Sequence, residues 1–206
     1  MPKVLVVFHS RTGHTARLAD AVADGARSVR FTEVDVRRLD DLAPASVIEG
    51  VPGWKESREQ LAAKYRTLES FERLAEYDAL VLGTPTRYGV MSAELKNLLD
   101  ATGPLWNSGA LVDKVGSAFS GTATPHGGNE LTIQSITTVM AHHGMILVPP
   151  GYTDPIMFKA GSPYGATYVG QPTDDDLAVA RHQGRRVATV AEWVRHAKSH
   201  AHGHQH

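Results

Sequence analysis

The chain of 206 residues contains no cysteine. Disulfide bonds, thiolate nucleophiles, cysteine-held iron–sulfur clusters and thiol redox chemistry are therefore excluded. Aromatic residues are also scarce, at 7% of the chain, and no apolar run approaches the ~18 residues of a membrane-spanning helix. We therefore expect no membrane insertion.

The chain also has almost no net charge. Its 21 Lys and Arg residues stand against 22 Asp and Glu, which gives a formal charge of −1. A nucleic-acid-binding domain carries a basic excess, so no nucleic-acid partner is expected. An electron carrier that docks through a strongly acidic face is disfavoured for the same reason. The chain enters an apolar run at Lys3, too early for a signal peptide, and we expect a cytoplasmic protein.

Four short apolar runs predict buried β-strands, at residues 4–8, 79–82, 115–119 and 145–148. Their apolar residues are continuous rather than alternating, which is typical of a parallel sheet covered on both faces. A weaker run alternates Val34 and Val36 with charged residues, as an edge strand does.

Helical periodicity separates these strands. The apolar stripes are Leu18, Val22 and Ala26 after Thr15; Leu95, Leu98 and Leu99 after a candidate N-cap at Ser92; Ile133, Ile136 and Met140; and Leu177 to Val194. Five strands alternating with helices indicate a doubly wound α/β fold.

We expect one domain over residues 1–197 and a His-rich flexible tail over 198–206, solvated rather than metal-binding, and no metal site elsewhere. Two segments, residues 41–54 and 152–172, fit no element of the sheet. Long structured loops of this kind are usually functional or form subunit contacts.

The first strand leads into the polar stretch HSRTGHT, residues 9–15. In an open parallel sheet, ligands bind at the carboxyl ends of the strands. Hydroxyls and backbone N–H groups at a helix N-terminus form an anion site, and Gly13 lets the backbone curl tightly. Gly13 is followed by His14 rather than Lys, and only one glycine is present, so neither a nucleotide-triphosphate loop nor a dinucleotide fingerprint fits. The stretch indicates a cradle for one phosphate, with Arg11 as the only nearby cation; the alternative is an ordinary strand–helix turn in which Ser and Thr cap the helix.

Two further polar loops follow later strands, TPTRYG at residues 84–89 and SGTATPHGGNE at residues 120–130. Three such loops at one edge of a sheet would surround a planar polar ring that carries a phosphate. Flavin mononucleotide (FMN) has this shape.

These loops, with MAHHGM at residues 140–145, resemble the WrbA-type NAD(P)H:quinone oxidoreductases, and the resemblance reaches from Met1 to about Val190. It implies a flavodoxin-like, doubly wound five-stranded parallel sheet of order 2-1-3-4-5 with helices on both faces. It also implies FMN as cofactor, NAD(P)H as reductant, a quinone substrate, and a homotetramer (a dimer of dimers) in which neighbouring subunits complete each active site.

The resemblance also assigns site residues. The cofactor-binding positions are Ser10, Arg11, Thr12, Gly13, His14 and Thr15 in the first loop, Thr86, Arg87 and Tyr88 in the second, Gly121, Thr122, Ala123, Thr124, Pro125 and His126 in the third, and His142. Trp106, Tyr88 and Tyr152 are the substrate-facing candidates. Thr12 stands where the family often has an aromatic residue, and the third loop is one residue longer than usual.

The implied reaction is a ping-pong transfer of hydride from NAD(P)H to the flavin and of two electrons on to a quinone. His142 is a candidate proton donor, while His143 continues an apolar stripe and is expected in the core. Arg87 either offsets negative charge on the flavin or is an interface cation. The aromatic candidates either face the substrate or simply pack.

Three alternatives stay open. An NAD(P)H-dependent FMN reductase or azoreductase would use the same fold with a different acceptor. A flavodoxin-type electron carrier would not be an enzyme, and a binding protein would keep the flavin site without turnover.

Overall fold

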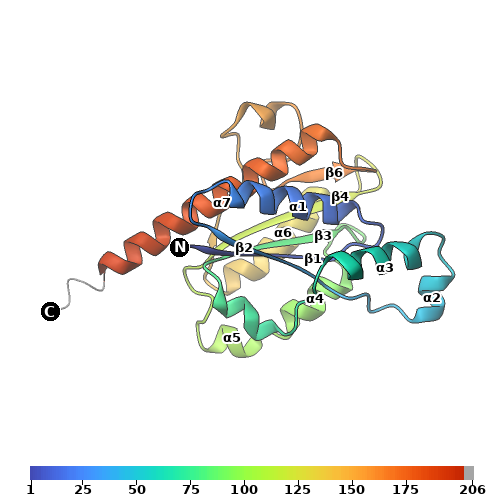
Figure 1. The fold of residues 1–206 in the computed structure, drawn as a ribbon, viewed down its shortest axis with the longest axis horizontal. Helices are drawn as coiled ribbons and strands as arrows, with labels where there is room; N and C mark the ends of the chain where they lie inside the picture. The colour runs from blue at the N-terminus through green and yellow to red at the C-terminus, as the bar shows by residue number, and fades with distance from the viewer. Residues whose placement is uncertain (202–206) are drawn as a thin grey trace.

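The structure, a computed structural model, describes residues 1–201. Its centre is a parallel sheet of order β2-β1-β3-β4-β5, as predicted (Figure 1). The strands are β1 (Lys3–Phe8), β2 (Glu33–Arg38), β3 (Ala79–Pro85), β4 (Val115–Thr122) and β5 (Ile146–Leu147). All pairs are parallel, so the carboxyl ends of β1, β3 and β4 lie at one edge.

The fifth position of the sheet is divided between two short strands. β5 pairs with the start of β4, and β6 (Thr167–Val169) pairs with its end at Ser120–Thr122. The strand expected at 145–148 is therefore only two residues long, and segment 152–172 supplies a strand that the sequence analysis did not predict. Three residues between Ala166 and Gly170 are too few for a periodicity to be seen.

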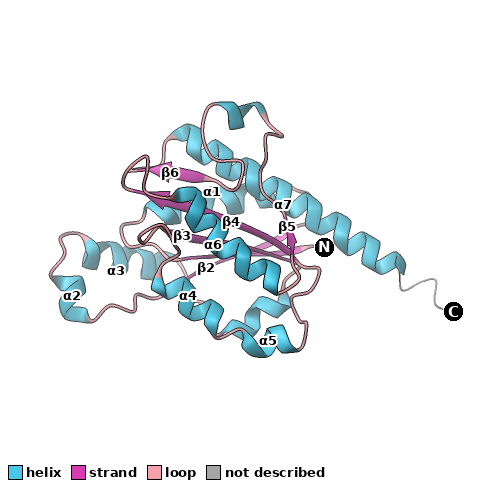
Figure 2. Cartoon of the chain, turned by 180° about the vertical axis from the view of Figure 1, so that it is seen from behind, coloured by secondary structure: helices cyan, strands magenta, loops and turns pink. Residues whose placement is uncertain are grey.

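Helices cover both faces of the sheet (Figures 1 and 2). The helices α1 (His14–Arg27) and α7 (Asp174–Ala201) share one apolar cluster with β1, and α4 (Ala93–Asp100) and α6 (Asn129–His142) share another on the opposite face. Two glycines let α1 and α7 approach closely: a Cβ on Gly25 would lie 1.9 Å from the Arg181 carbonyl oxygen, and one on Gly184 would lie 1.9 Å from that of Val22.

Segment 41–54 belongs to an excursion beyond the carboxyl edge of the sheet, formed by α2 (Ala45–Glu49) and α3 (Trp54–Lys64). The remaining elements are α5 (Gly103–Asn107) and two 3-10 turns, η1 (Phe71–Glu76) and η2 (Pro155–Phe158).

The last helix continues past the expected domain limit at 197 and reaches Ala201; the rest of the predicted tail, residues 202–206, lies outside the described residues. None of the helices within residues 1–201 combines the length and the apolar character needed to cross a bilayer.

Candidate functional site

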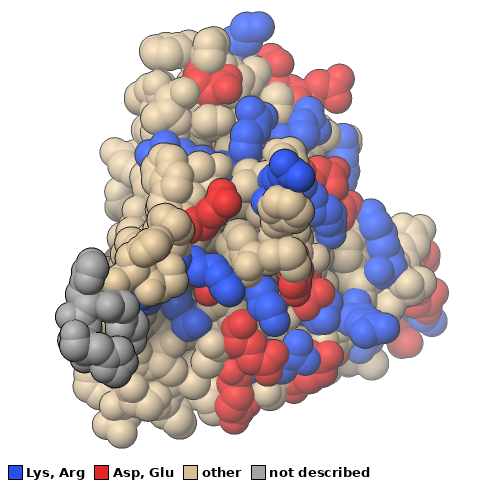
Figure 3. Space-filling model, turned by 60° about the vertical axis from the view of Figure 1, so that its left-hand side comes forward, with Lys and Arg blue, Asp and Glu red and all other residues tan. Residues whose placement is uncertain are grey.

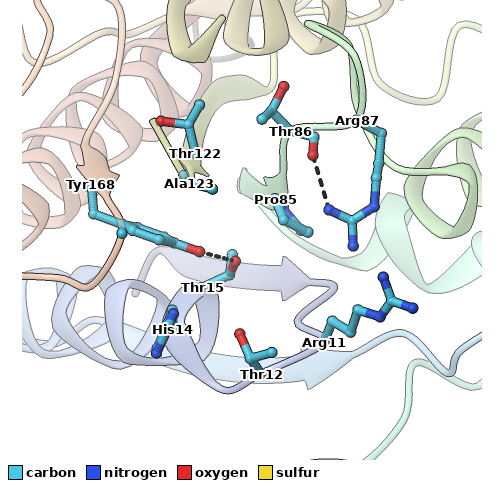
Figure 4. Close-up of a pocket in the computed structure, with 12 residues that line it drawn as sticks. Arg11, Thr12, His14, Thr15, Pro85, Thr86, Arg87, Thr122, Ala123 and Tyr168 are labelled. Carbon is cyan, nitrogen blue, oxygen red and sulfur yellow. Dashed lines mark hydrogen bonds between the residues drawn. The ribbon is translucent and has the colours of Figure 1, made fainter. Parts of the chain in front are cut away.

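A cavity of about 260 Å³ opens at the carboxyl edge of the sheet, where the three predicted loops meet (Figure 4). It is lined by residues from each loop and from β6, namely Arg11, Thr12, His14, Thr15, Pro85, Thr86, Arg87, Gly121, Thr122, Ala123, Tyr168 and Gly170. The sequence analysis named nine of these twelve; Pro85, Tyr168 and Gly170 are the additions.

The first loop leaves hydrogen-bonding groups unsatisfied. The helix α1 begins after Gly13, whose φ of 83° suits glycine, and no side chain among the described residues caps its N-terminal N–H groups. The hydroxyl of Ser10 is buried and has no hydrogen-bond partner within residues 1–201, and neither Ser10 nor Gly13 is among the residues that line the cavity. Neutral donors around a helix N-terminus fit a phosphate ester, so the residues present fit the phosphate of FMN.

The second loop is a tight turn at the end of β3. The N–H of Arg87 donates to the carbonyl of Val90 at 2.8 Å, and the N–H of Gly89 donates to the Thr86 hydroxyl at 3.2 Å. Thr132 on α6 donates to the same hydroxyl at 2.7 Å, which fixes the turn against the next helix. Tyr88, with a φ of 53°, is held in the left-handed region with its side chain in solvent.

The third loop is anchored at its base and exposed at its tip. Asn129 donates to the Thr122 hydroxyl at 3.3 Å and to the Tyr168 carbonyl at 3.1 Å. Gly121, Thr122 and Ala123 line the cavity, whereas Thr124, Pro125 and His126 are exposed outside it.

Tyr168 closes the cavity from β6. Its hydroxyl is hydrogen-bonded to that of Thr15 at 3.1 Å, and its ring meets that of His14 edge-on at 6.0 Å between centroids. Burial raises the pKa of Tyr168, so the phenol stays protonated. A Cβ on Gly121 would lie 1.9 Å from the tyrosine ring, so only glycine admits it. The structure extends β4 to Thr122, past the strand predicted at 115–119, so Gly121 is a strand glycine of the kind that marks the close approach of another group.

Two cations stand at the other end of the cavity (Figure 4). Arg87 donates to the Thr86 carbonyl at 2.9 Å. Arg11 stacks on the indole of Trp54, with 3.4 Å between the guanidinium carbon and the ring centroid. Burial, and then the charge of Arg87, lower the pKa of Arg11.

The remaining candidates do not line this cavity. Because α6 runs from the site edge back toward the start of β4, its last residue, His142, is ~21 Å from the first along the helix axis. Trp106 lies in α5 and is 60% exposed, and Tyr152 is exposed with its ring 5.3 Å from that of Phe158. The neighbouring His143 is buried in the core as expected, 2.9 Å from the Thr102 hydroxyl.

Comparison with known proteins agrees with this geometry. The family model of NADPH-dependent FMN reductases matches residues 2–154. An NAD(P)H dehydrogenase (quinone) from Archaeoglobus fulgidus is 46% identical, covering 93% of this chain and 98% of its own. One of the same name from Trichlorobacter lovleyi is 44% identical, covering 92% and 97%. Among solved structures, a flavodoxin, WrbA-like protein from Agrobacterium tumefaciens is 27% identical with a TM-score of 0.69, covering 94% of this chain and 99% of that one.

The FMN reductase match covers about three-quarters of the chain, and the curated relatives align over nearly its full length. The protein therefore belongs to the NADPH-dependent FMN reductase family, together with these NAD(P)H dehydrogenases (quinone).

Proposed function

We propose that this protein is an FMN-dependent oxidoreductase that transfers two electrons from NAD(P)H to a quinone in a ping-pong cycle. The observation that carries the proposal is a cavity formed by three loops at the carboxyl edge of the sheet, beside an uncapped helix N-terminus. The first loop also contains the Ser10 hydroxyl, which is buried without a hydrogen-bond partner in residues 1–201. The names of the relatives from Archaeoglobus and Trichlorobacter support the choice of a quinone as acceptor.

Bound FMN supplies hydride acceptance and two-electron donation; the chain binds and orients the reactants. The hydroxyls of Ser10, Thr12 and Thr15 and the N–H groups of the first turn of α1 would hold the phosphate. The second loop and residues 121–123 would hold the ring, with the Thr86–Thr132 bond keeping the second loop in place. The third-loop residues Thr124, Pro125 and His126 are exposed beside the cavity and would contact the ring from there.

Three candidates need a second subunit. His142, Trp106 and Tyr152 are exposed and do not line this chain's own cavity. We therefore propose a homotetramer in which they reach the site of a neighbour, where His142 donates a proton to the quinone oxygen and the aromatic rings support the flat substrate. The exposed edge strand β5 and the exposed ring of Phe158 offer apolar area for such contacts.

A cytoplasmic location suits this proposal, since the chain has no cysteine and the reductant is an intracellular nucleotide. No nucleic-acid partner is proposed.

The test is an anaerobic two-step titration of the FMN-loaded protein. NADPH is expected to bleach the flavin absorbance, and benzoquinone to restore it, with parallel lines in double-reciprocal plots of the full reaction. A purified protein that takes up no FMN, or whose flavin NADPH does not reduce, would refute the proposal.

The matching family model favours a second candidate, a reductase that releases reduced FMN as its product. Flavin that stays bound through many turnovers with quinone excludes this candidate, and loss of flavin on reduction supports it. The flavodoxin-type carrier is less well supported, because positive and negative side chains are mixed on the face seen in Figure 3 rather than gathered by sign.

A further inference from the structure

Two guanidinium groups, those of Arg11 and Arg87, line the same end of the cavity (Figure 4). Neither forms an ion pair with a carboxylate among residues 1–201. By contrast, Arg37, Arg58 and Arg73 each lie within ion-pair distance of a carboxylate. The Nε of Arg11 is buried without a hydrogen-bond partner in that part of the chain. Two like charges that face one cavity, with no carboxylate of residues 1–201 within ion-pair distance of either, indicate a binding site for an anion.

The excursion beyond β2 fixes the position of Arg11. Trp54, at the start of α3, is buried and offers its ring face to the guanidinium at 3.4 Å. The indole N–H donates to Asp41 at 3.2 Å, and His9 Nε2 lies 3.1 Å from the same carboxylate oxygen. Arg11 loses the ring stack if it leaves the cavity, and the hydrogen bonds to Asp41 hold the ring of Trp54 in place.

The carboxylates nearest to Arg11 are already engaged. Asp41 accepts from His9 and Trp54 and lies 3.8 Å from Arg58, and the other ring nitrogen of His9 lies 3.3 Å from Glu94. Burial alone would raise the pKa of Asp41, but these partners outweigh it and lower that pKa, so the carboxylate stays ionised. Asp41 and Glu94 reduce the positive potential at Arg11 without forming an ion pair with it, and neither of them lines the cavity.

The flavin phosphate does not need this site. It has the helix N-terminus and the hydroxyls near Thr15, whereas the Arg11 side chain extends from the loop toward Arg87, away from Thr15 and His14 (Figure 4). FMN carries a single phosphate. The other anion that enters the cavity during the proposed reaction is the dinucleotide reductant, whose pyrophosphate lies next to its nicotinamide ribose.

We propose that Arg11 and Arg87 form a second anion subsite that binds the pyrophosphate of the nicotinamide dinucleotide, with Trp54 as the positioning residue that holds Arg11. The inference rests on the proposed function and names how its site recognises the reductant. Planar guanidinium groups bind phosphate oxygens through paired hydrogen bonds, which a lysine cannot reproduce.

The first experiment measures binding rather than turnover. NADP⁺ is titrated into the oxidised, FMN-loaded protein by calorimetry, and FMN into the FMN-free protein by fluorescence quenching. Arg11→Met is expected to weaken NADP⁺ binding about tenfold and to weaken FMN binding much less. Arg11→Lys should recover only part of the lost NADP⁺ affinity.

The charge-matched control is Arg30→Met, because Arg30 is exposed in the turn between α1 and β2 at the opposite edge of the sheet. A loss of FMN affinity as large as that of NADP⁺ would assign Arg11 to the flavin phosphate and overturn the proposal.

The second experiment compares NADPH with 1-benzyl-1,4-dihydronicotinamide, a hydride donor without phosphate. The ratio of their second-order rates of flavin reduction is expected to fall about tenfold in Arg11→Met, and an unchanged ratio contradicts the subsite. If neither donor reduces the flavin of the unaltered protein, the proposed function fails before this inference is reached.

A double-mutant cycle tests the role of Trp54. Trp54→Leu should lower the ratio of the flavin-reduction rates with NADPH and with 1-benzyl-1,4-dihydronicotinamide in the parent protein. It should have no further effect on this ratio in Arg11→Met. Equal effects in both backgrounds would show that Trp54 acts through general packing and not through Arg11.

Discussion

The hydroxyl of Tyr168 is hydrogen-bonded to that of Thr15 at 3.1 Å, although 153 residues separate them in the chain. This bond joins β6, in the segment after the fifth strand, to the first turn of the helix that follows the first strand. Both side chains are buried, so the contact holds the two segments together at one end of the cavity. The segment at 152–172 is therefore part of the proposed cofactor site.

Replacing Tyr168 by Phe tests this role. The ring remains and the hydroxyl is lost, so Thr15 loses its partner and becomes less well oriented toward the phosphate. We expect FMN affinity to fall about fivefold, which corresponds to about 1 kcal/mol for one hydrogen bond. Fluorescence quenching of FMN measures the change. Tyr164→Phe is the matched control, because Tyr164 belongs to the same segment but does not line the cavity. Equal affinities for the two variants would contradict the role.

Gly121 can be tested by adding a single methyl group. In Gly121→Ala the new Cβ would meet the ring of Tyr168 at 1.9 Å, so either the ring or the end of β4 must move. Overpacking of this kind costs about 1–3 kcal/mol of unfolding free energy, measurable by urea denaturation. Gly103→Ala serves as control, because a Cβ there has no atom within 4 Å among the described residues. If Gly121→Ala is as stable as Gly103→Ala, the ring of Tyr168 moves aside without a loss of unfolding free energy, and the prediction is wrong.

Ser10 is predicted to act with opposite signs on stability and on binding. Its buried hydroxyl has no partner in the described chain, so Ser10→Ala removes an unsatisfied group and should stabilise the FMN-free protein by about 1 kcal/mol. The same change removes a donor to the phosphate and should weaken FMN binding about fivefold.

Ser92→Ala provides the comparison, since the Ser92 hydroxyl is also buried and unpartnered within residues 1–201 but lies at the start of α4 and not in the first loop. It should change the stability without changing FMN affinity. Loss of stability in Ser10→Ala would mean that its hydroxyl already has a partner in the FMN-free protein.

The loops of the site could be predicted from the sequence because their chemistry is local. Hydroxyls and glycine between an apolar run and a helical stripe mark a strand–loop–helix unit, and parallel topology brings such loops to one edge. The strand order follows the resemblance and is confirmed. Tyr168 and Trp54 were missed because their roles depend on contacts between distant segments, which no periodicity encodes.

The positions of His142 and Trp106 illustrate a second limit. Their motifs point to a functional role, but the connection of β4 to β5 places the end of α6 away from the cavity of the same chain. The sequence of one chain does not show whether a side chain contributes to the active site of its own subunit or to that of a neighbour.

His143 should make stability depend on pH. Its burial, and then the neighbouring His142, lower the pKa of His143 below the ordinary value of 6.5. The unfolded chain therefore takes up a proton at a higher pH than the folded one, so stability is complete above about pH 6.5 and is lost as pH falls below it.

Urea denaturation of the FMN-free protein at pH 7.5 and 5.5 gives this loss directly. His143→Gln should show a smaller loss than the parent, and the exposed His142→Gln should keep nearly the parent value. An unchanged loss in His143→Gln would contradict the assignment.

His142 provides the test of the proposed neighbour. His142→Ala should slow quinone reduction on the order of 10²-fold, as for loss of a general acid, while flavin reduction by NADPH changes less. Stopped-flow measurement of the two half-reactions separates these effects, and equal slowing of both would remove the proposed role.

The subunit that supplies His142 can then be identified by mixing two defective chains. Gly13→Val places a β-branched residue at a φ of 83° and should prevent FMN binding in its own subunit. In assemblies formed by co-expressing His142→Ala with an excess of Gly13→Val, all bound flavin lies in His142→Ala subunits, and most of their neighbours carry an intact His142. The rate of quinone reduction per flavin should then rise well above that of the His142→Ala protein alone. A rate that stays at the level of the single variant means that His142 serves its own chain or no active site, and the shared-site arrangement is wrong.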